Sequence, residues 1–257
     1  IIEDLALLGL LDDKIVVGSM NRGGLKGASF EMDDRYTAYD VDGIVESGLD
    51  FGKNLVRINL KDAGSVDTLE ATALAVSDAA DAELPIMLEP FMSEWVDGKI
   101  VNDLSPDAVI LSIAIASGLG NSSAYSWLKL PVVPEMERVM ASTTLPTLLL
   151  GGDPNGDAEE TFASWAAALA LPGVRGLVVG RSLLYPADGD VASAIDTAAA
   201  AHGPARILMQ IAGIGSAKRV VGKDGNAAPL EDFARVINVN LIGTYNAARL
   251  FAAACAK

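Results

Sequence analysis

Short apolar runs alternate along the chain with longer stretches of helical character. Seven runs have the length and continuity of buried strands: residues 14–19, 55–60, 85–90, 125–130, 147–150, 176–180 and 206–211. Most are separated by segments with helical character, several of them rich in alanine: residues 5–11, 41–47, 66–83, 106–117, 134–143, 158–171, 190–201 and 229–254. Near-continuous apolar strands joined by helical crossovers are typical of a parallel sheet. The pattern therefore predicts an α/β fold, either a TIM-barrel-like (β/α) parallel barrel or an open doubly wound sheet.

The chain shows no internal boundary. Its 257 residues are enough for one barrel or one large sheet, and no linker or low-complexity run divides them. We therefore predict a single α/β domain over residues 1–257. The first residue is not Met, and the opening residues read as the middle of a helix. This indicates a fragment, a processed chain or an engineered piece.

Composition and charge narrow the classes of function. The formal net charge is −15 and the pI is near 4.4, which argues against nucleic acid or an anionic membrane as a partner. One cysteine, Cys255, excludes an internal disulfide and a cysteine metal cluster. One histidine, His202, excludes a His-rich metal site and leaves little room for a Ser/His/Asp triad. Neither a signal peptide nor a transmembrane run is seen, so we expect a cytoplasmic protein.

The run SWLKLPVV, residues 126–133, carries one charged residue, Lys129, in its middle. Burying an unpaired ammonium costs several kcal/mol or forces it to lose its proton. Two interpretations stay open. Lys129 could lie on an edge strand and reach to water. Alternatively, it is an amine of lowered pKa at the carboxyl end of a barrel strand, able to form a Schiff base.

Two further charged residues belong to neighbouring predicted strands. Glu89 ends the strand that precedes the Lys129 strand, so the two side chains could be neighbours in a parallel sheet. Such a carboxylate could relay protons during imine formation, or the pair could be a structural ion pair. Arg57, within residues 55–60, could hold a substrate anion if it points inward, or form a salt bridge under the barrel.

Glycine-rich loops follow the predicted strands 147–150 and 176–180. Gly151 and Gly152 follow residues 147–150, and Gly180 and Arg181 lie at the carboxyl end of the predicted strand 176–180. Free backbone N–H groups, a helix start and an arginine could cradle a phosphate there. Glycine turns are also common for conformational reasons alone.

Other polar residues have simpler interpretations. An acidic cluster in the first loop, Glu31, Asp33 and Asp34, lacks the spacing of a defined metal loop, and we expect a solvated face. His202 lies at a helix end, where a capping or surface role is expected. No metal and no cofactor are predicted.

Residues 3–197 resemble one bacterial branch of the class I aldolase superfamily, which includes deoxyribose-phosphate aldolase and the archaeal-type fructose-bisphosphate aldolase. The segments that carry the resemblance occur in order: KIVVGSMNRGGLKGASFEMDDR, MLEPFM, NDLSP, IASGLG, SWLKLPVV, LPTLLLGGDP and VRGLVVGRSLLYP. The resemblance implies a TIM barrel in which Lys129, on the sixth strand, matches the Schiff-base lysine. It also implies that Gly151, Gly152, Gly180 and Arg181 match the region that holds substrate phosphate. In the family's order the first two strands and first helix are absent.

Residues 200–254 are similar to the middle of a short-chain dehydrogenase/reductase, of the 3-hydroxyacyl-CoA dehydrogenase type. Gln210-Ile211-Ala212-Gly213 lies where that family has Asn-Asn-Ala-Gly or a close variant, and Asn240 in NVNLIGT matches the family's helix asparagine. The family's Gly-rich dinucleotide motif and its Tyr-x-x-x-Lys pair are missing. The resemblance therefore implies neither a bound dinucleotide nor dehydrogenase activity.

Together the two resemblances predict a composite chain. Residues 1–200 would form the aldolase-like barrel portion, and residues 201–257 a strand–loop–helix unit that completes it, with 206–211 in place of the missing first strand. Such a sheet is one strand short of eight, and its open edge invites a homo-oligomer. We expect an engineered, generated or chimeric scaffold with no established activity. The alternative is a class I aldolase-like lyase that acts on a small sugar phosphate or aldehyde through Lys129, with Glu89 as proton relay and Arg181 near the phosphate.

Overall fold

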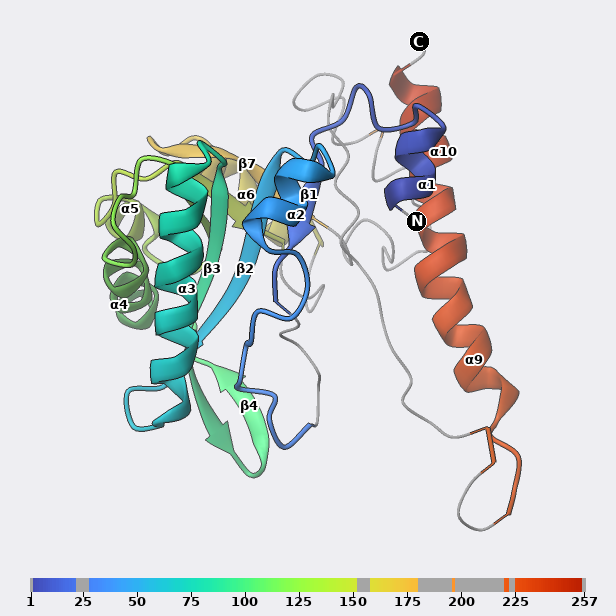
Figure 1. Cartoon of the computed structure of the whole chain (residues 1–257), viewed down its shortest axis with the longest axis horizontal. Helices are drawn as coiled ribbons and strands as arrows, with labels where there is room; N and C mark the ends of the chain where they lie inside the picture. The colour runs from blue at the N-terminus through green and yellow to red at the C-terminus, as the bar shows by residue number, and fades with distance from the viewer. Residues whose placement is uncertain are drawn as a thin grey trace. The chain divides into compact units, whose positions relative to one another are not determined.

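The structure is a computed structural model that describes residues 2–21, 28–151, 158–179, 196, 220–221 and 225–255 (Figure 1). The chain divides into two compact units. The first comprises residues 1–150 and 163–177, and the second comprises residues 151–162 and 178–257. The single domain predicted for residues 1–257 stays a prediction.

A curled sheet forms the centre of the first unit (Figure 1). Its main strands lie side by side in the order β1 (Val17–Ser19), β2 (Phe51–Ile58), β3 (Ile86–Val96), β5 (Ser126–Pro131), β6 (Thr147–Leu150) and β7 (Val174–Val178). Along this path, the neighbouring strands from β1 to β6 are all paired in parallel. Among the described residues the sheet ends at β1 and β7 and does not close. The fold is therefore the predicted α/β barrel type in an incomplete form.

Helices follow the strands and cover one face of the sheet (Figure 1). They are α2 (Val41–Glu46), α3 (Gly64–Asp81), α4 (Pro106–Ser117), α5 (Met136–Met140) and α6 (Ala158–Leu169), whereas α1 (Ile2–Leu7) precedes β1. Helix α3 packs on β2, and α4 packs on β3 and β5. The local sequence explains the bounds of α4, because Ser105 accepts a hydrogen bond from the Ala108 N–H and Pro106 occupies the first turn.

The strand register divides side chains between two faces of the sheet. One set points to the helices and forms the apolar core with α2, α3, α4 and α5: Ile86, Leu88, Leu128, Leu130 and Leu149. The alternate positions, including Lys53, Met87 and Trp127, point to the other face, which we call the concave face. The rings of Phe51 and Trp127 meet edge to face there, with centroids 5.4 Å apart, although β3 lies between their strands.

A β-hairpin extends from β3 into residues 91–102, between the predicted strand 85–90 and the predicted helix 106–117, where the sequence pattern predicts no strand. Strand β3 continues past the predicted end at residue 90 and returns as β4 (Lys99–Asn102), which pairs with it in antiparallel register. The turn is Asp97-Gly98, and both residues have positive φ, 49° and 73°. An Asp-Gly pair between alternating apolar and polar residues is a strong signal for a two-residue hairpin turn. The sequence therefore carried a signal for this hairpin, although the hairpin was not predicted.

The remaining predicted elements agree with the structure where it describes them. Six of the seven predicted strands are confirmed, with end shifts of up to six residues. The seventh, residues 206–211, and the helix predicted over 190–201 lie outside the described residues, apart from residue 196. The proposed replacement of a missing first strand by 206–211 stays a prediction.

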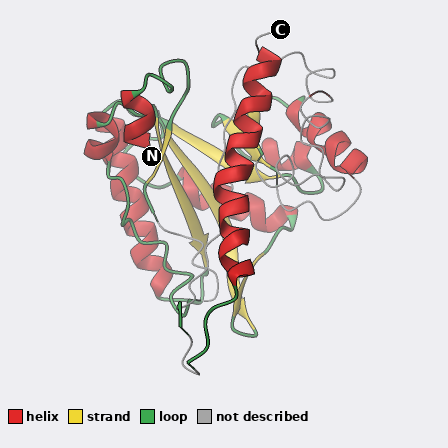
Figure 2. Cartoon of the chain, turned by 90° about the vertical axis from the view of Figure 1, so that its right-hand side faces the viewer, coloured by secondary structure: helices red, strands yellow, loops and turns green. Residues whose placement is uncertain are grey.

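The second unit contains one long helix near the end of the chain (Figures 1 and 2). It consists of α9 (Leu230–Ile237), a π-helical turn (Asn238–Gly243) and α10 (Thr244–Cys255). The predicted helix over 229–254 is confirmed, although the π turn within it was not predicted. Within the described part of the chain, no helix is long and apolar enough to cross a membrane.

Candidate functional site

Three charged side chains meet on the concave face. The Lys129 Nζ lies 2.7 Å from the Glu89 Oε1, and the Lys53 Nζ lies 2.5 Å from the Glu89 Oε2. Lys129 and Glu89 are only 7% and 8% exposed, and Lys53 is partly buried. One carboxylate is therefore shared by two ammonium groups in a largely buried setting.

The sheet places these three residues on adjacent strands. Leu88 and Leu128 are register partners on β3 and β5, so the residues that follow them, Glu89 and Lys129, are neighbours. On the other side of β3, Leu55 of β2 is the register partner of Glu89, and Lys53 precedes it by two residues on the same face. The predicted proximity of Glu89 and Lys129 is confirmed.

The position of β5 decides between the two interpretations of Lys129. This strand pairs with β3 on one side and β6 on the other, so it is not an edge strand. Lys129 is buried and paired with Glu89 instead of reaching to water. The edge-strand interpretation is wrong, because the neighbouring strands and the carboxylate enclose the amine.

The electrostatics of the cluster favour an amine that loses its proton more readily than usual. Burial lowers the pKa of Lys129, and the positive charge of Lys53 lowers it further, whereas Glu89 opposes the shift. Burial by itself would raise the pKa of Glu89, but the charges of Lys53 and Lys129 outweigh burial and hold that pKa below its usual range. Glu89 and Lys129 therefore both lose their protons more readily than usual.

Lys53 was missed by the sequence reasoning. The predicted strand began at residue 55, whereas β2 begins at Phe51 and includes Lys53. The alternation Lys53, Leu55, Arg57 places all three on one face of an extended strand, and this was the available signal.

Arg57 forms a salt bridge, which was one of its two predicted roles. Its Nη2 lies 2.6 Å from the Asp34 Oδ1, and its backbone N–H donates to the Asp34 Oδ2 at 2.9 Å. The guanidinium also donates to the Glu31 carbonyl, and its Nη1 lies 3.6 Å from the Glu31 Oε1. Burial raises the pKa of Asp34, and the Arg57 guanidinium acts against that shift. These contacts occupy the guanidinium of Arg57.

The expected solvated acidic face is wrong for Asp34. This residue is fully buried beneath Arg57, and Glu31 is half-buried beside the same guanidinium. Asp33 differs, because one of its carboxylate oxygens pairs with the exposed Arg35 at 2.6 Å. Among the described residues, no group of three or more His, Cys, Asp or Glu is arranged to hold a metal ion.

Asn21 follows β1 and joins this strand to its neighbour. Its side chain donates to the Leu55 carbonyl at 2.6 Å and to the Asp34 carbonyl at 3.1 Å, and accepts from the Leu55 N–H at 3.1 Å. All the polar atoms of this amide therefore contact backbone groups, which is a structural role.

The predicted phosphate region is described only at Gly151. Its backbone N–H donates to the Val178 carbonyl at 3.0 Å, so this donor is already used between β6 and β7. Gly152, Gly180 and Arg181 lie outside the described residues, as does His202. Phosphate binding by these residues stays a prediction.

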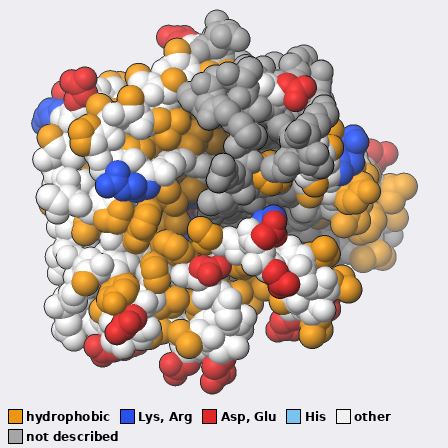
Figure 3. Space-filling model, turned by 90° about the horizontal axis from the view of Figure 1, so that it is seen from above, with side chains coloured by type: hydrophobic (Ala, Val, Ile, Leu, Met, Phe, Trp, Pro, Cys, Tyr) orange, Lys and Arg blue, Asp and Glu red, His pale blue; other side chains and the backbone are white. Residues whose placement is uncertain are grey.

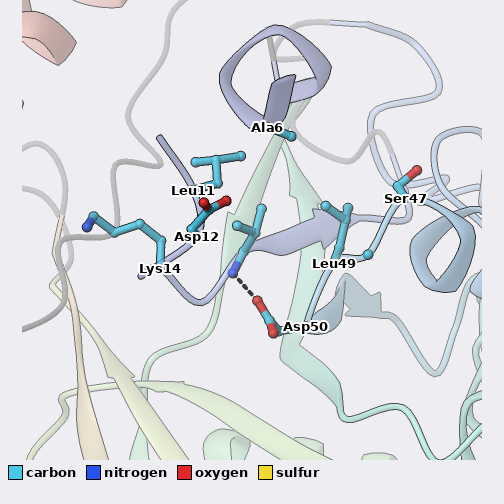
Figure 4. A pocket seen from close by; sticks show the side chains of 9 residues that line it. Ala6, Leu11, Asp12, Lys14, Ser47, Leu49 and Asp50 are labelled. Carbon is cyan, nitrogen blue, oxygen red and sulfur yellow. Dashed lines mark hydrogen bonds between the residues drawn. The ribbon is translucent and has the colours of Figure 1, made fainter. Parts of the chain in front are cut away.

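A small cavity lies at the opposite, amino-terminal end of β1 and β2 (Figure 4). It has a volume of about 230 Å³ and is lined by residues of α1, the segment after it and the α2–β2 turn, including Leu11, Lys14 and Asp50. One wall is fixed by the Val16 N–H, which donates to the Asp50 Oδ2 at 2.7 Å (Figure 4). None of the three residues of the lysine cluster lines this cavity.

The curled parallel sheet and its solved relatives define the class of protein. Two archaeal fructose-1,6-bisphosphate aldolase structures are 19% and 18% identical to this chain, with TM-scores of 0.50 and 0.51. They cover 66% and 64% of this chain, which in turn spans 65% and 62% of theirs. At this identity the likeness shows the fold, an aldolase-like α/β barrel.

The chain belongs to the Cgl0159-like family, whose sequence profile matches residues 1–199. The crystal structure of Cgl0159 from Corynebacterium glutamicum is 74% identical and has a TM-score of 0.72. That match covers 76% of this chain and 66% of Cgl0159, so the chain spans just under two thirds of that relative. The resemblance to an aldolase-type barrel is confirmed at the level of the fold.

A second similarity concerns a shorter part of the chain. The 3-hydroxyacyl-CoA dehydrogenase type-2 of Bos taurus is 42% identical over 80 residues. This match covers 29% of the chain and 31% of the dehydrogenase. The chain therefore spans less than a third of that curated relative.

Proposed function

We propose that this Cgl0159-like chain carries a Schiff-base lysine, Lys129, that reacts with a small carbonyl compound in the manner of a class I aldolase-like lyase. The observation that carries the proposal is the buried contact of 2.7 Å between the Lys129 Nζ and the Glu89 Oε1. The lowered pKa of Lys129 supports it, because only the neutral amine attacks a carbonyl carbon.

Each residue of the cluster has a role in the proposed step. The neutral amine of Lys129 adds to the carbonyl carbon, and Glu89 takes a proton from the nitrogen and returns it to the oxygen. A carbinolamine results. Loss of its hydroxyl group with one more proton releases water and leaves the imine. Lys53 holds the other carboxylate oxygen at 2.5 Å, which orients Glu89 for both transfers.

The iminium form would then make carbon–carbon bond cleavage feasible. A protonated imine accepts the electron pair of the breaking carbon–carbon bond and becomes an enamine. The hydroxyl group of the other fragment gives its proton to the Glu89 carboxylate, and that fragment leaves as an aldehyde. This is the lyase reaction that the alternative prediction names. The cluster supports a carbonyl substrate, because it offers an amine and a carboxylate to a carbonyl group.

The reactive cluster differs from the rest of the surface in its charge. The chain carries 34 acidic and 19 basic residues, and acidic side chains are prominent around the face shown in Figure 3. While both lysines are protonated, they share one carboxylate, so the cluster then has a net positive charge on an acidic protein. This supports a substrate that carries partial negative charge on a carbonyl oxygen, although the anion site at Arg181 stays a separate proposal.

Reductive trapping tests the proposal. The full chain is incubated with small aldehydes, ketones and sugar phosphates, treated with borohydride and digested for mass spectrometry. We expect an adduct on Lys129 and none on Lys53, and loss of the adduct in Lys129→Arg. Lys99, an exposed lysine on β4, serves as an internal measure of non-specific labelling. Equal labelling of Lys129 and Lys99 would contradict the proposal.

A second candidate is a composite scaffold without turnover. It is favoured by the end of the family match at residue 199 and by the separate similarity to a dehydrogenase. In this case a folded protein would give no adduct at Lys129 with any carbonyl compound tested. A thermal shift with NAD(H) separates a third outcome, because dinucleotide binding to the dehydrogenase-like segment would raise the melting temperature.

A further inference from the structure

The lysine cluster on the concave face, formed by Lys53, Glu89 and Lys129, has too few negative charges to balance a substrate bound as a protonated imine. The Glu89 carboxylate lies 2.5 Å from the Lys53 Nζ and 2.7 Å from the Lys129 Nζ. Within the described residues, neither lysine pairs with another carboxylate. A protonated imine at Lys129 keeps the positive charge of this residue, so two cations would then share one anion. A negative group on the substrate would balance the second cation.

Lys53 is the member of the cluster that can receive this negative group. Its side chain is 20% exposed, whereas those of Lys129 and Glu89 are 9% and 11% exposed. An ammonium has three N–H donors, and the contact with the Glu89 Oε2 uses one of them. The register partner of Lys53 on β1 is Ser19, whose hydroxyl is uncharged and donates to the Asn21 carbonyl at 3.1 Å. Lys53 therefore keeps donors for a second carboxylate.

Arg57, a further cation on the same face of β2, is already neutralised. Its Nη2 lies 2.6 Å from the Asp34 Oδ1, and its Nη1 lies 3.6 Å from the Glu31 Oε1. A substrate anion at this guanidinium would lie against two carboxylates that are largely buried, and their repulsion would oppose binding. Lys53 therefore suits a substrate anion better than Arg57 does.

The spacing within the cluster indicates where the negative group stands in the substrate. Lys53 and Lys129 contact the two oxygens of one carboxylate, and these oxygens are joined through a single carbon atom. Both ammonium groups therefore reach the same small group. In a β-keto acid, the keto carbon and the carboxylate carbon are also joined through a single carbon atom. Such a compound can place its keto carbon at Lys129 and its carboxylate at Lys53.

We propose that the lysine cluster binds a β-keto acid and decarboxylates it, a further activity that rests on the proposed Schiff base at Lys129. Glu89 accepts a proton from the Lys129 ammonium, and the neutral amine adds to the keto carbon. The keto oxygen then leaves as water, with the proton from Glu89 and a second proton from the same nitrogen. The resulting iminium and Lys53 are two cations, and Glu89 and the substrate carboxylate are two anions.

Loss of carbon dioxide from this balanced intermediate needs no further base. The bond between the carboxylate carbon and its neighbour breaks, its electron pair moves to the iminium, and carbon dioxide leaves a neutral enamine. The enamine carbon takes a proton supplied by the solvent, and water then releases the ketone and restores the Lys129 ammonium. Met87 and Trp127 precede Glu89 and Lys129 by two residues on the same face, and this apolar base favours a step in which a carboxylate loses its charge.

Acetoacetate and its neutral amide, acetoacetamide, test the proposal on the full chain. We expect the wild type to release acetone from acetoacetate, followed by NMR, faster than Lys129→Arg does. Borohydride trapping then compares the two compounds, and each rate of adduct formation at Lys129 is divided by the rate of the same compound with free Nα-acetyl-lysine. The ratio should favour acetoacetate at least about tenfold, the effect of one charge-assisted contact with Lys53.

Variants of Lys53 separate binding of the carboxylate from the effect of Lys53 on the amine. Lys53→Met should abolish the preference for acetoacetate, whereas Lys53→Arg should retain it. A change in the pKa of Lys129 cancels in the ratio, because both compounds react with the same amine. Lys99→Met, on the exposed part of β4, is the control and should leave the ratio unchanged.

Three results would overturn the decarboxylase proposal while leaving the Schiff base in place. They are equal trapping of the two compounds by the wild type, a preference that persists in Lys53→Met, and acetone release no faster than in Lys129→Arg. A failure of the proposed function itself looks different, because no carbonyl compound, including simple aldehydes, would then give an adduct at Lys129. That result would overturn both proposals.

Discussion

Two groups of buried charges each include one residue of β2, Arg57 in one group and Lys53 in the other. The groups differ in how completely their charges are paired. Arg57 of β2 meets Asp34 through its side chain and its backbone N–H, and it also contacts Glu31. Lys53, four residues earlier on β2, shares the single carboxylate of Glu89 with Lys129. The first group has enough negative partners for its cation, and the second has two cations for one anion.

The comparison shows that burial of charge alone does not identify a reactive group. A guanidinium keeps its proton in proteins, so the fully paired Arg57 can only hold structure. A lysine amine can lose its proton when a second cation and burial act on it together, and both act on Lys129. The excess of positive charge, more than the depth of burial, separates the candidate site from the structural ion pair.

The largest effect on stability should come from breaking the fully paired group. Asp34→Ala leaves the Arg57 guanidinium buried without its main partner and should lower the free energy of unfolding by about 3–5 kcal/mol. Asp107→Ala is the control, because Asp107 pairs with Arg138 on the exposed surface, and its loss should be much smaller. Urea unfolding measures both. Equal losses in the two variants would show that the Arg57–Asp34 pair does not stabilise the fold as its burial indicates.

Glu89→Gln should have the next largest effect, with a distinctive pH dependence. The variant should be less stable at pH 7 by about 2 kcal/mol, because two ammonium groups lose their common carboxylate, although Lys129 can respond by losing its proton. The folded-state pKa of Glu89 is lowered, so its stabilising contribution is complete above the ordinary value of 4.5 and disappears as the pH falls through the folded pKa.

The measurement is the difference in unfolding free energy between wild type and Glu89→Gln from pH 7 to pH 2. Comparison of the two proteins cancels the contribution of Asp34, whose pKa is shifted upward. A difference that stays constant below pH 4 would show that Glu89 gains nothing from the two lysines.

Two substitutions of Lys53 separate its charge from its shape. Lys53→Met removes the charge that lowers the pKa of Lys129, so the pH profile for trapping a carbonyl compound should move upward. At neutral pH the trapping rate should fall by up to about tenfold, the effect of one pKa unit. Lys53→Arg keeps the charge and should leave the midpoint of the profile in place. A shift of similar size in both variants would mean that Lys53 acts through packing.

Within the lysine cluster, the sequence indicates Glu89 and Lys129 more readily than Lys53. Glu89 and Lys129 lie on strands consecutive in the parallel sheet, each at a similar distance from its strand start, so the strand pattern alone makes them neighbours. Lys53 is less visible, because Gly52, Lys53 and Asn54 interrupt the apolar run and displace the predicted start of β2. The pairing of Asp34 with Arg57 spans 23 residues and depends on the path of a loop, which local periodicity does not encode.

The elements of the fold can also be divided into those that the sequence predicts and those that it does not. Strands and helices with apolar periodicity were predicted, because each must bury one side against a neighbour. The β3–β4 hairpin and the π turn were not, because each depends on a local departure from regular spacing. The family relationship agrees with the barrel-like portion, since its profile matches residues 1–199.

The smallest effect on stability should come from replacing a neutral polar residue on the helix-covered face of the sheet. Unlike the substitutions above, this one should raise the free energy of unfolding. Asn54 is fully buried, and neither its Oδ1 nor its Nδ2 has a hydrogen-bond partner among the residues that the structure describes. A buried amide without partners costs about 1–3 kcal/mol, so Asn54→Val, which removes both polar atoms, should raise the free energy of unfolding by about 1 kcal/mol.

Asn21→Val is the matched comparison for this gain. Asn21 is also buried, but its amide contacts the backbone of Leu55 and Asp34 through three hydrogen bonds. The same substitution there should lower stability by about 2 kcal/mol, because it leaves buried backbone groups of β2 unpaired. Urea unfolding of both variants tests the contrast. A loss of stability in Asn54→Val as large as in Asn21→Val would mean that an ordered water or another group satisfies the Asn54 amide in solution.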